Sequence, residues 1–448
     1  MKKIVPITNA HLCEVAKEYS KDPRNAVLRH ALSKTAIPDV VHSKDSCASI
    51  KPQFSIDIKT MGATNQKQSG RCWIFAATNV LREIIAKKCD IKEFEISQAH
   101  FAFYDRLEKI NFALESIIDL IDVDYDDRVL QHVLTWGVGD GGQWDMFVNI
   151  VKKYGICPKL VNDETTQSDQ TWISASLINA NIRKFASDAR IAYKKGGMEK
   201  VRKLQAELMD KCYKLLVNCY GLPVDKFDFE YVDSKNAYHI EKGFTPKSFF
   251  DKYIGSELDE YVSVINAPTA SGPYEFNKSY TIAYLGNVVE GNGIRHLNVS
   301  MPRLKELIIA QLKDQQITWF GSDVSFYGER KDGIWDDATF DYKSAFDLEF
   351  KMDKGEGLKY RYSAMNHAMV ITGVNLDDKG VPTKWKIENS WGNENGNKGY
   401  YIMSASWFDM FTYQAAIKRK YLSPEELKAY NTKPIVLKPW DPMGTLAK

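Results

Sequence analysis

The sequence predicts an α+β protein whose helices dominate its first half and whose strands dominate its last third. Apolar residues recur at helical spacing over residues 73–87. Apolar runs typical of buried strands occur much later, at residues 367–374 and 385–388. The 448 residues exceed the roughly 250 to 300 at which a single core stops growing, so two or more cooperating subdomains are expected.

The elements are expected in a fixed order along the chain. Before residue 55 the pattern predicts one helix, residues 24–33, within a segment that wraps the surface. Three further helices are expected at residues 72–87, 97–109 and 143–154. The last part of the chain should hold a helix and four strands, at residues 302–314, 316–324, 367–374, 385–388 and 399–403.

Between these parts, residues 171–220 are strongly helical in composition and are broken at Gly196-Gly197, which predicts a helical pair. Its exposed faces carry five cations: Arg183, Lys184, Lys194, Lys195 and Lys200. A solvated surface is the simpler interpretation of these charges, and a positive channel lining is the alternative.

Cys72 is the candidate nucleophile. It follows a Ser69-Gly70 turn and stands at the start of a predicted helix. A helix N-terminus carries about half a positive charge, which favours a thiolate and can lower the pKa of a cysteine below its free value of about 8.5. Taken alone, a cysteine before Trp73 is more often a packed small apolar residue.

A thiol nucleophile needs an imidazole partner and a group that orients it. Among eight histidines, only His367 lies in a suitable pattern, at the start of a predicted buried strand. Asn389 follows 22 residues later, at the end of the expected antiparallel partner strand. Its amide oxygen can accept a hydrogen bond from one imidazole nitrogen and fix the tautomer.

These motifs resemble those of the papain-like cysteine peptidases, which have a cysteine before an aromatic residue and His and Asn far downstream. Gln66 precedes Cys72 by six residues, where that family has its oxyanion glutamine. The resemblance implies that Gln66 and the Cys72 backbone N–H bind the oxyanion. It also implies that His367 acts as acid and base, that Asn389 orients it and that Trp391 shields their hydrogen bond. With all these residues in order, catalysis becomes the better interpretation of Cys72.

The spacing between Cys72 and His367 indicates which group of papain-like peptidases the chain resembles. Cys72 and His367 are separated by 295 residues, against roughly 130 to 150 in papain and the cathepsins, so about 150 residues are inserted. The insertion, Arg71 and the terminal residues 438–448 together resemble the bleomycin hydrolase and aminopeptidase C family. That resemblance implies a papain-like two-part fold with a cleft between a helical and a β half. The expected parts are a wrapping segment, the helical half, a mainly helical insertion, the β half and a C-terminal arm in the cleft: residues 1–55, 56–160, 161–295, 296–430 and 431–448.

Two glycines are candidate substrate-binding residues. Gly141-Gly142 precede a predicted helix, where glycines commonly serve only the turn. The resemblance implies that they also form a rail for the substrate backbone.

The C-terminal arm bears on the class of substrate. Its prolines forbid a regular helix or central strand, so a disordered terminus is the simplest expectation. Trp440, Met443 and Leu446 favour a docked arm instead, because they are costly to leave in water. In the family that the chain resembles, the terminal carboxylate faces the amino group of the substrate. Lys448 would carry that carboxylate, or Ala447 if Lys448 is trimmed.

Composition supports a cytoplasmic enzyme. The net charge of +2 gives no support to a nucleic-acid or membrane surface. Seven cysteines at irregular spacing indicate neither a zinc site nor a disulfide framework. Pro6, Asn9 and His11 interrupt any signal peptide, and no stretch of 18 apolar residues follows. We therefore expect a protein that is neither secreted nor membrane-spanning.

The resulting hypothesis is a cytoplasmic cysteine aminopeptidase that releases N-terminal residues from peptides through a thioester. No cofactor and no metal are expected, and neither nucleic acid nor a membrane is an expected partner. A homohexamer is implied by the resemblance alone. One alternative is a cysteine endopeptidase or oligopeptidase of the same family whose arm leaves the cleft unrestricted. A non-catalytic binding protein with a basic channel is a further alternative, against which the intact set of Gln66, Cys72, His367 and Asn389 argues.

Overall fold

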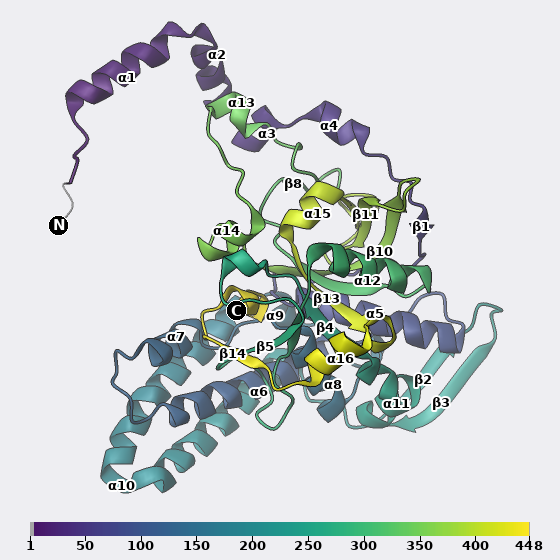
Figure 1. The fold of residues 1–448 in the computed structure, drawn as a ribbon. Coiled ribbons are helices and arrows are strands. Elements are labelled where there is room, and N and C mark those ends of the chain that lie inside the picture. Colours follow the sequence, from purple (N-terminus) through teal and green to yellow (C-terminus); the bar gives the residue numbers. More distant parts are fainter. Residues whose placement is uncertain (1–3, 448) are drawn as a thin grey trace.

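The computed structural model describes residues 4–447, and its N-terminal segment consists of short helices (Figure 1). They are α1 (Asn9–Lys21), α2 (Pro23–Leu32), α3 (Ile37–Val41) and α4 (Lys44–Ser49). The expectation of a single helix before residue 55 is wrong, because the side chains of Thr8, Asp22 and Ser43 cap three separate helices. Figure 1 shows α1 and α2 standing away from the body, and neither helix has a buried residue.

Four helices form the next part of the chain. They are α5 (Cys72–Cys89), α6 (Gln98–Asp119), α7 (Arg128–Trp136) and α8 (Trp144–Tyr154). The helices expected near residues 72, 97 and 143 are confirmed, whereas α7 was not expected. Helix α6 runs ten residues further than expected because Ile110, Leu114 and Ile117 continue its buried face.

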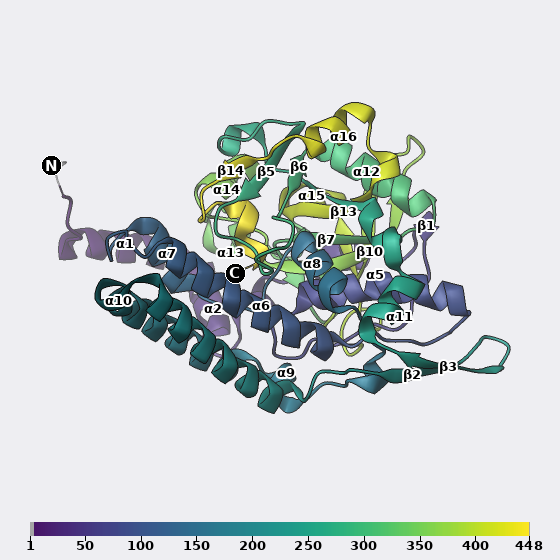
Figure 2. The same ribbon diagram turned by 90° about the horizontal axis from the view of Figure 1, so that it is seen from below.

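The long helical stretch after residue 170 is the largest addition to the body. After η1 (Lys159–Val161) and α9 (Thr166–Asp169), α10 (Trp172–Tyr220) is a helical pair with non-helical angles at Gly196 and Gly197, as the sequence predicts. It packs against α6, and Figure 2 shows the two lying side by side along one flank of the molecule. The five cations expected on its surface are all exposed.

Strands and short helices follow α10. Strands β2 (Phe227–Val232) and β3 (Tyr238–Phe244) form a separate antiparallel ribbon. Four more elements come next: α11 (Pro246–Tyr253), η2 (Gly255–Glu260), β4 (Tyr261–Ile265) and β5 (Lys278–Ile282), with η3 (Thr269–Ser271) between the last two. Strands β4 and β5 lie within residues 161–295, where the sequence predicts a mainly helical insertion, and they pair with strands of the main sheet.

The main sheet has the order β14-β5-β6-β4-β13-β7-β10-β11-β12-β9-β8 within residues 4–447, and β1 (Ile56–Asp57) pairs with β10. The remaining strands are β6 (His296–Asn298), β7 (Thr318–Ser322), β8 (Gly328–Glu329), β9 (Ile334–Trp335), β10 (His367–Leu376), β11 (Pro382–Glu388), β12 (Tyr400–Ser404), β13 (Thr412–Lys418) and β14 (Ile435–Leu437). The expected strands at residues 316–324, 367–374, 385–388 and 399–403 are thus confirmed.

Helices from the second half of the chain complete the body. They are α12 (Met301–Lys313), α13 (Tyr342–Phe346), α14 (Lys354–Lys359), α15 (Ala405–Phe411), α16 (Pro424–Asn431), η4 (Arg419–Tyr421) and η5 (Pro442–Ala447). Among the described residues, no helix combines the length and apolar character that a membrane crossing requires.

The core forms where α5 packs against β7 and β10. Almost the whole first half of α5 is buried, including Trp73, Ala77 and Leu81 with no exposed surface. The indole N–H of Trp319 on β7 donates to the carbonyl of Trp73 at 3.2 Å, which fixes the first turn of α5 to the sheet. This contact joins the helical part to the β part and places the start of α5 beside the start of β10.

Gly155 provides a test of how the helical part is connected to α11. It ends α8 at a φ of 73°, and a Cβ there would lie 2.2 Å from the backbone of Pro246. Gly155→Ala should therefore destabilise the protein by more than the about 1 to 3 kcal/mol of an unfavourable φ. Gly221→Ala is the matched control, because φ is 87° and open space surrounds its Cβ position. Equal losses of unfolding free energy in urea titrations would contradict the interpretation.

Candidate active site

Cys72 is the first residue of α5, and it is buried at the start of strand β10. The backbone N–H of Ala368 donates to Cys72 Sγ at 3.4 Å. Ala368 directly follows His367, so the sulfur lies at the end of the strand that carries the candidate base. The structure thus brings together two groups that lie almost 300 residues apart in the sequence.

His367 and Asn389 lie at adjacent ends of the antiparallel pair β10 and β11. His367 Nε2 and Asn389 Oδ1 are 2.9 Å apart. The same oxygen accepts the backbone N–H of Ser390 at 2.8 Å, which sets the orientation of the amide. Because an amide oxygen can only accept, Nε2 carries a proton and Nδ1 is the nitrogen left to take one.

Trp391 covers this hydrogen bond. Its ring stacks on the His367 imidazole with centroids 4.8 Å apart and planes inclined by 27°. The guanidinium of Arg330 lies 4.7 Å from the centre of the Trp391 ring. The shielding expected from the sequence is therefore also a packing contact, and it leaves His367 only 5% exposed.

Gln66 is held by the residue that follows Asn389. Its Oε1 accepts the Ser390 hydroxyl at 2.6 Å, and its backbone N–H donates to the Ser390 carbonyl at 2.9 Å. Gln66 Nε2 donates to the carbonyl of Ser69 at 2.6 Å, within the turn that precedes Cys72. One amide N–H of Gln66 remains for a further acceptor. Sequence reasoning did not single out Ser390, although it lies inside the motif.

Burial controls the charges of the candidate pair. It raises the pKa of the Cys72 thiol to about 11, against a smaller opposing contribution from the Ala368 N–H. It lowers the pKa of His367 to about 4, and the hydrogen bond to Asn389 opposes this shift. The expectation that the helix N-terminus lowers the pKa of Cys72 is therefore wrong: desolvation outweighs the helix dipole. Burial disfavours each charge taken alone, so a thiolate and an imidazolium formed together by proton transfer would stabilise each other.

Gly141 and Gly142 lie in a tightly held turn beside Trp73. A Cβ on Gly142 would lie 2.4 Å from the Trp73 ring, so only glycine allows this close approach. Lys109 Nζ donates to the Gly141 carbonyl at 2.6 Å. Lys109 was missed from sequence because nothing in its own helical segment indicates a partner 32 residues away.

Asp140 connects this turn to the nucleophile. Its carboxylate accepts the backbone N–H of Gly70 at 3.0 Å and is paired with the buried side chain of Arg106. The Asp140 carbonyl accepts the indole N–H of Trp73 at 2.6 Å. The turn before Cys72 and the glycine turn are therefore fixed to each other.

The C-terminal arm is docked, as Trp440, Met443 and Leu446 indicated. The Arg128 guanidinium lies 3.8 Å from the centre of the Trp440 ring. Gln143 Nε2 donates to the Met443 carbonyl at 3.3 Å, from the start of α8. Met443 and Leu446 are each 3% exposed, which excludes the disordered terminus that was the simplest expectation.

The end of the arm contacts the segment before His367 and the neighbouring strand β7. Thr445 Oγ1 donates to the carbonyl of Met365 at 2.8 Å, two residues before His367. Leu446 packs at Gly321, the residue that faces Ala368 across the β7–β10 pair. Ala447 borders a small cavity together with Lys109 and Gly139, next to the glycine turn. Lys448 lies outside the described residues.

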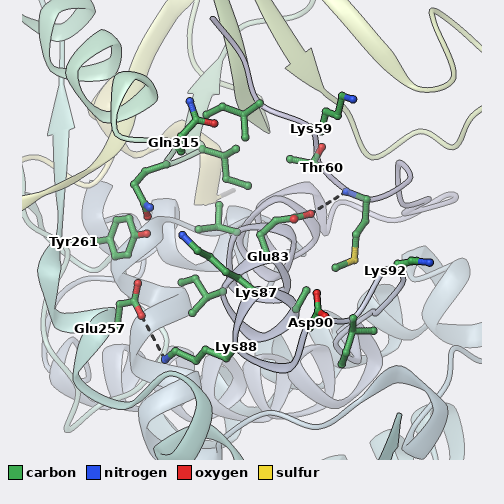
Figure 3. Close-up of a pocket in the computed structure, with 18 residues that line it drawn as sticks. Lys59, Thr60, Glu83, Lys87, Lys88, Asp90, Lys92, Glu257, Tyr261 and Gln315 are labelled. Carbon is green, nitrogen blue, oxygen red and sulfur yellow. Dashed lines mark hydrogen bonds and ion pairs between the residues drawn. The ribbon is translucent and has the colours of Figure 1, made fainter. Parts of the chain in front are cut away.

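A larger cavity, of about 740 Å³, lies at the other end of α5 (Figure 3). It is lined by residues of the second half of that helix, including Glu83 and Lys87, and by Tyr261 and Gln315. None of the motif residues lines it. Within residues 4–447 no group of three or more His, Cys, Asp or Glu side chains could hold a metal ion.

Comparison with known proteins finds one family model and several close full-length relatives. The model of the peptidase C1-like family matches residues 6–444. Aminopeptidase C of Lactobacillus delbrueckii subsp. lactis is 45% identical over 433 residues, covering 96% of each chain. Aminopeptidase C of Lactococcus lactis subsp. lactis is 42% identical over 441 residues, covering 98% of this chain and all of its own length. The crystal structure of PepW from Lactobacillus rhamnosis HN001 superimposes with a TM-score of 0.95 at 41% identity, over 98% of this chain and 99% of that one.

The pairing of Cys72 with His367 can be tested by alkylation of Cys72. In the wild type, iodoacetamide should react at neutral pH, because His367 takes the thiol proton. In His367→Ala the thiolate forms only as the pH approaches the raised pKa of Cys72, about 11, so at pH 7 the rate should fall by roughly 100-fold or more. Asn389→Ala should show a smaller loss, because that variant keeps the imidazole. Identical pH profiles in the wild type and His367→Ala would exclude the pairing.

Proposed function

The chain belongs to the peptidase C1-like family and is a cysteine aminopeptidase, and we propose that it releases residues from free peptide N-termini through a thioester on Cys72. The observation that supports the proposal is the docked arm: Thr445 donates to the Met365 carbonyl two residues before His367, and Leu446 packs at Gly321, which faces Ala368. In this proposal the arm occupies the N-terminal side of the scissile bond and so would leave room there for very little of a substrate.

In the proposed reaction, His367 Nδ1 takes the thiol proton as Cys72 Sγ attacks the scissile carbonyl carbon. The carbonyl electron pair moves to oxygen, and the Cys72 backbone N–H and the free amide N–H of Gln66 stabilise the oxyanion. As the oxyanion collapses, the peptide C–N bond breaks and the imidazolium gives its proton to the leaving amine. Water, deprotonated by His367, then hydrolyses the thioester and restores the thiol.

The arm supplies the specificity in this proposal. A terminal carboxylate at its end would bind the ammonium of a substrate, a charge-assisted hydrogen bond worth about 1.5 to 3 kcal/mol. A blocked N-terminus loses that bond. The endopeptidase alternative would require the arm to leave the cleft, against the burial of Met443 and Leu446.

The substrates in this proposal are peptides, and the assembly is a homohexamer in the cytoplasm. Exposed apolar side chains near the N-terminus, including Ile4, Val5, Ile7 and Val27, support self-association because they are costly to leave in water. All seven cysteines carry free thiols, which supports a reducing compartment.

Cys72→Ala should abolish peptide hydrolysis, with a loss of at least about 1000-fold in kcat, because the attacking atom is removed. The fold should persist, since alanine occupies less space than cysteine at this helix start. Cys212→Ala is the control, because Cys212 is a buried thiol on α10 with no contact to the site. Hydrolysis by a folded Cys72→Ala protein would refute the assignment of Cys72 as the nucleophile.

Deletion of residues 440–448 should shift cleavage from single N-terminal residues toward internal bonds, as mass spectrometry of a peptide library would show. Peptides with acetylated N-termini should be poor substrates of the full-length protein and improve in the deletion variant. Removal of Lys448 alone should keep or improve aminopeptidase activity, because Ala447 would then present the carboxylate. Unchanged cleavage positions after deletion of the arm would favour the endopeptidase alternative.

A further inference from the structure

A buried ion pair lies behind the candidate site. Arg82 Nη2 on α5 and Glu388 Oε1 on β11 are 2.8 Å apart, and their side chains are 2% and 0% exposed. The proposed mechanism uses neither residue. Glu388 nevertheless directly precedes Asn389, and Arg82 lies on the helix that begins with Cys72.

Glu388 receives donors from two sequence-distant elements. Asn79 Nδ2 donates to its Oε1 at 2.8 Å, and the Thr60 hydroxyl donates to its Oε2 at 2.6 Å. Asn79 is seven residues after Cys72, which is almost two full helical turns, so both lie on nearly the same face of α5. One face of this helix therefore presents Cys72 toward the Ala368 N–H and Asn79 toward Glu388.

The same cluster holds the segment that carries Gln66. Arg82 Nη2 donates to the Gly62 carbonyl at 3.0 Å, and Asn79 Nδ2 donates to Thr64 Oγ1 at 3.1 Å. The Thr64 carbonyl accepts the backbone N–H of Gly392, three residues after Asn389, at 2.9 Å. The Glu388 carboxylate thus connects three parts of the chain: residues 60–66, helix α5 and the end of β11.

We propose that Glu388, held by Arg82, Asn79 and Thr60, is a positioning residue that fixes the Cys72 helix against the Asn389 strand end and the Gln66 segment. This inference rests on the proposed function and adds a group that touches no substrate. Successive side chains of a strand point to opposite faces, so an anchor on Glu388 sets where Asn389 points. A displacement of about 1 Å between reacting groups can cost roughly 100-fold in rate.

The charge of Glu388 depends on its partner. Burial raises the pKa of Glu388 to about 7, while the Arg82 guanidinium and the Thr60 hydroxyl lower it. Glu83 on α5 raises the pKa of Glu388 further, Lys386 on β11 lowers it, and Tyr400 on β12 lies beside the same carboxylate through Thr60. Charge-assisted hydrogen bonds are about twice as strong as neutral ones, so the ionised carboxylate is the stronger anchor.

The test must separate positioning from stability, because Glu388→Gln alone would leave Arg82 as an uncompensated buried charge. The double variant Arg82→Met/Glu388→Leu removes both charges and retains apolar volume, which commonly preserves stability. In this double variant Asn79 retains its hydrogen bond to Thr64, and Thr60 retains its 2.7 Å hydrogen bond with the Tyr400 hydroxyl. We expect kcat to fall about 10- to 100-fold with KM changed less than about twofold. The rate of Cys72 alkylation by iodoacetamide at neutral pH should fall in parallel.

Two control variants test whether loss of another nearby carboxylate, or of another ion pair, has the same effect on kcat. Glu83→Gln neutralises the other carboxylate near Arg82, 3.7 Å away on the side of the cavity in Figure 3. It keeps an oxygen that can accept the Met61 N–H, and so should leave kcat unchanged. Arg303→Met/Glu426→Leu removes a pair between α12 and α16 that makes no contact with the site, and should also leave kcat unchanged. If the Arg82 and Glu388 double variant does not fold, Asn79→Ser decides, because it removes one donor and leaves the ion pair in place.

The outcomes are distinct. A folded double variant, or Asn79→Ser, with lowered kcat and slower alkylation supports the inference. Wild-type kcat and an unchanged alkylation profile in the folded variant would overturn it, as would a change confined to KM. A wild-type protein that neither hydrolyses peptides nor reacts at Cys72 would refute the proposed function itself, before any comparison with the variants.

Discussion

The packing of α5 against β7 and β10 is the constraint on which the site depends. Neither half of the protein has a complete site: the helix brings Cys72, and the sheet brings His367 and Asn389. The bond from Trp319 to the Trp73 carbonyl and the bond from the Ala368 N–H to the Cys72 sulfur fix the two halves at one point. A helix displaced along its axis by one residue, about 1.5 Å, would remove the sulfur from that N–H.

Burial then sets the chemistry. It disfavours each charge of the Cys72 and His367 pair taken alone, so a charge at one group depends on a charge at the other. A desolvated site strengthens every later electrostatic interaction, including those from oxyanion donors. The same desolvation makes unsatisfied polar groups expensive. This explains why Asp140 and Glu388 each accept two or more hydrogen bonds or ion pairs, and why the Gln66 side chain accepts one hydrogen bond and donates another.

The sequence predicts the elements whose pattern is local and misses those that depend on distant parts of the chain. The helix at Cys72 and the strands at residues 367–374 and 385–388 were predictable because apolar periodicity is local. Helix α1 was missed although α2, which also has no buried residue, was predicted, because the signal for α1 is the Thr8 cap and not a core-facing pattern. Strands β4 and β5 were assigned to the insertion because sheet membership depends on pairing with distant strands. The pKa of Cys72 was misjudged because a helix start is visible in sequence, whereas complete desolvation is not.

The residues that sequence reasoning missed share one property, which is a partner far away in the chain. Lys109 reaches Gly141, and Arg82 reaches Glu388 across 306 residues. A charged residue on an amphipathic helix usually faces solvent, so its pattern alone predicts a surface position. What places Arg82 and Lys109 inside is the packing of the two halves, which encloses each cation with the acceptors that neutralise it. The motif residues were therefore predictable from local sequence, whereas these buried pairs, which belong to no motif, follow only from the packing of the two halves.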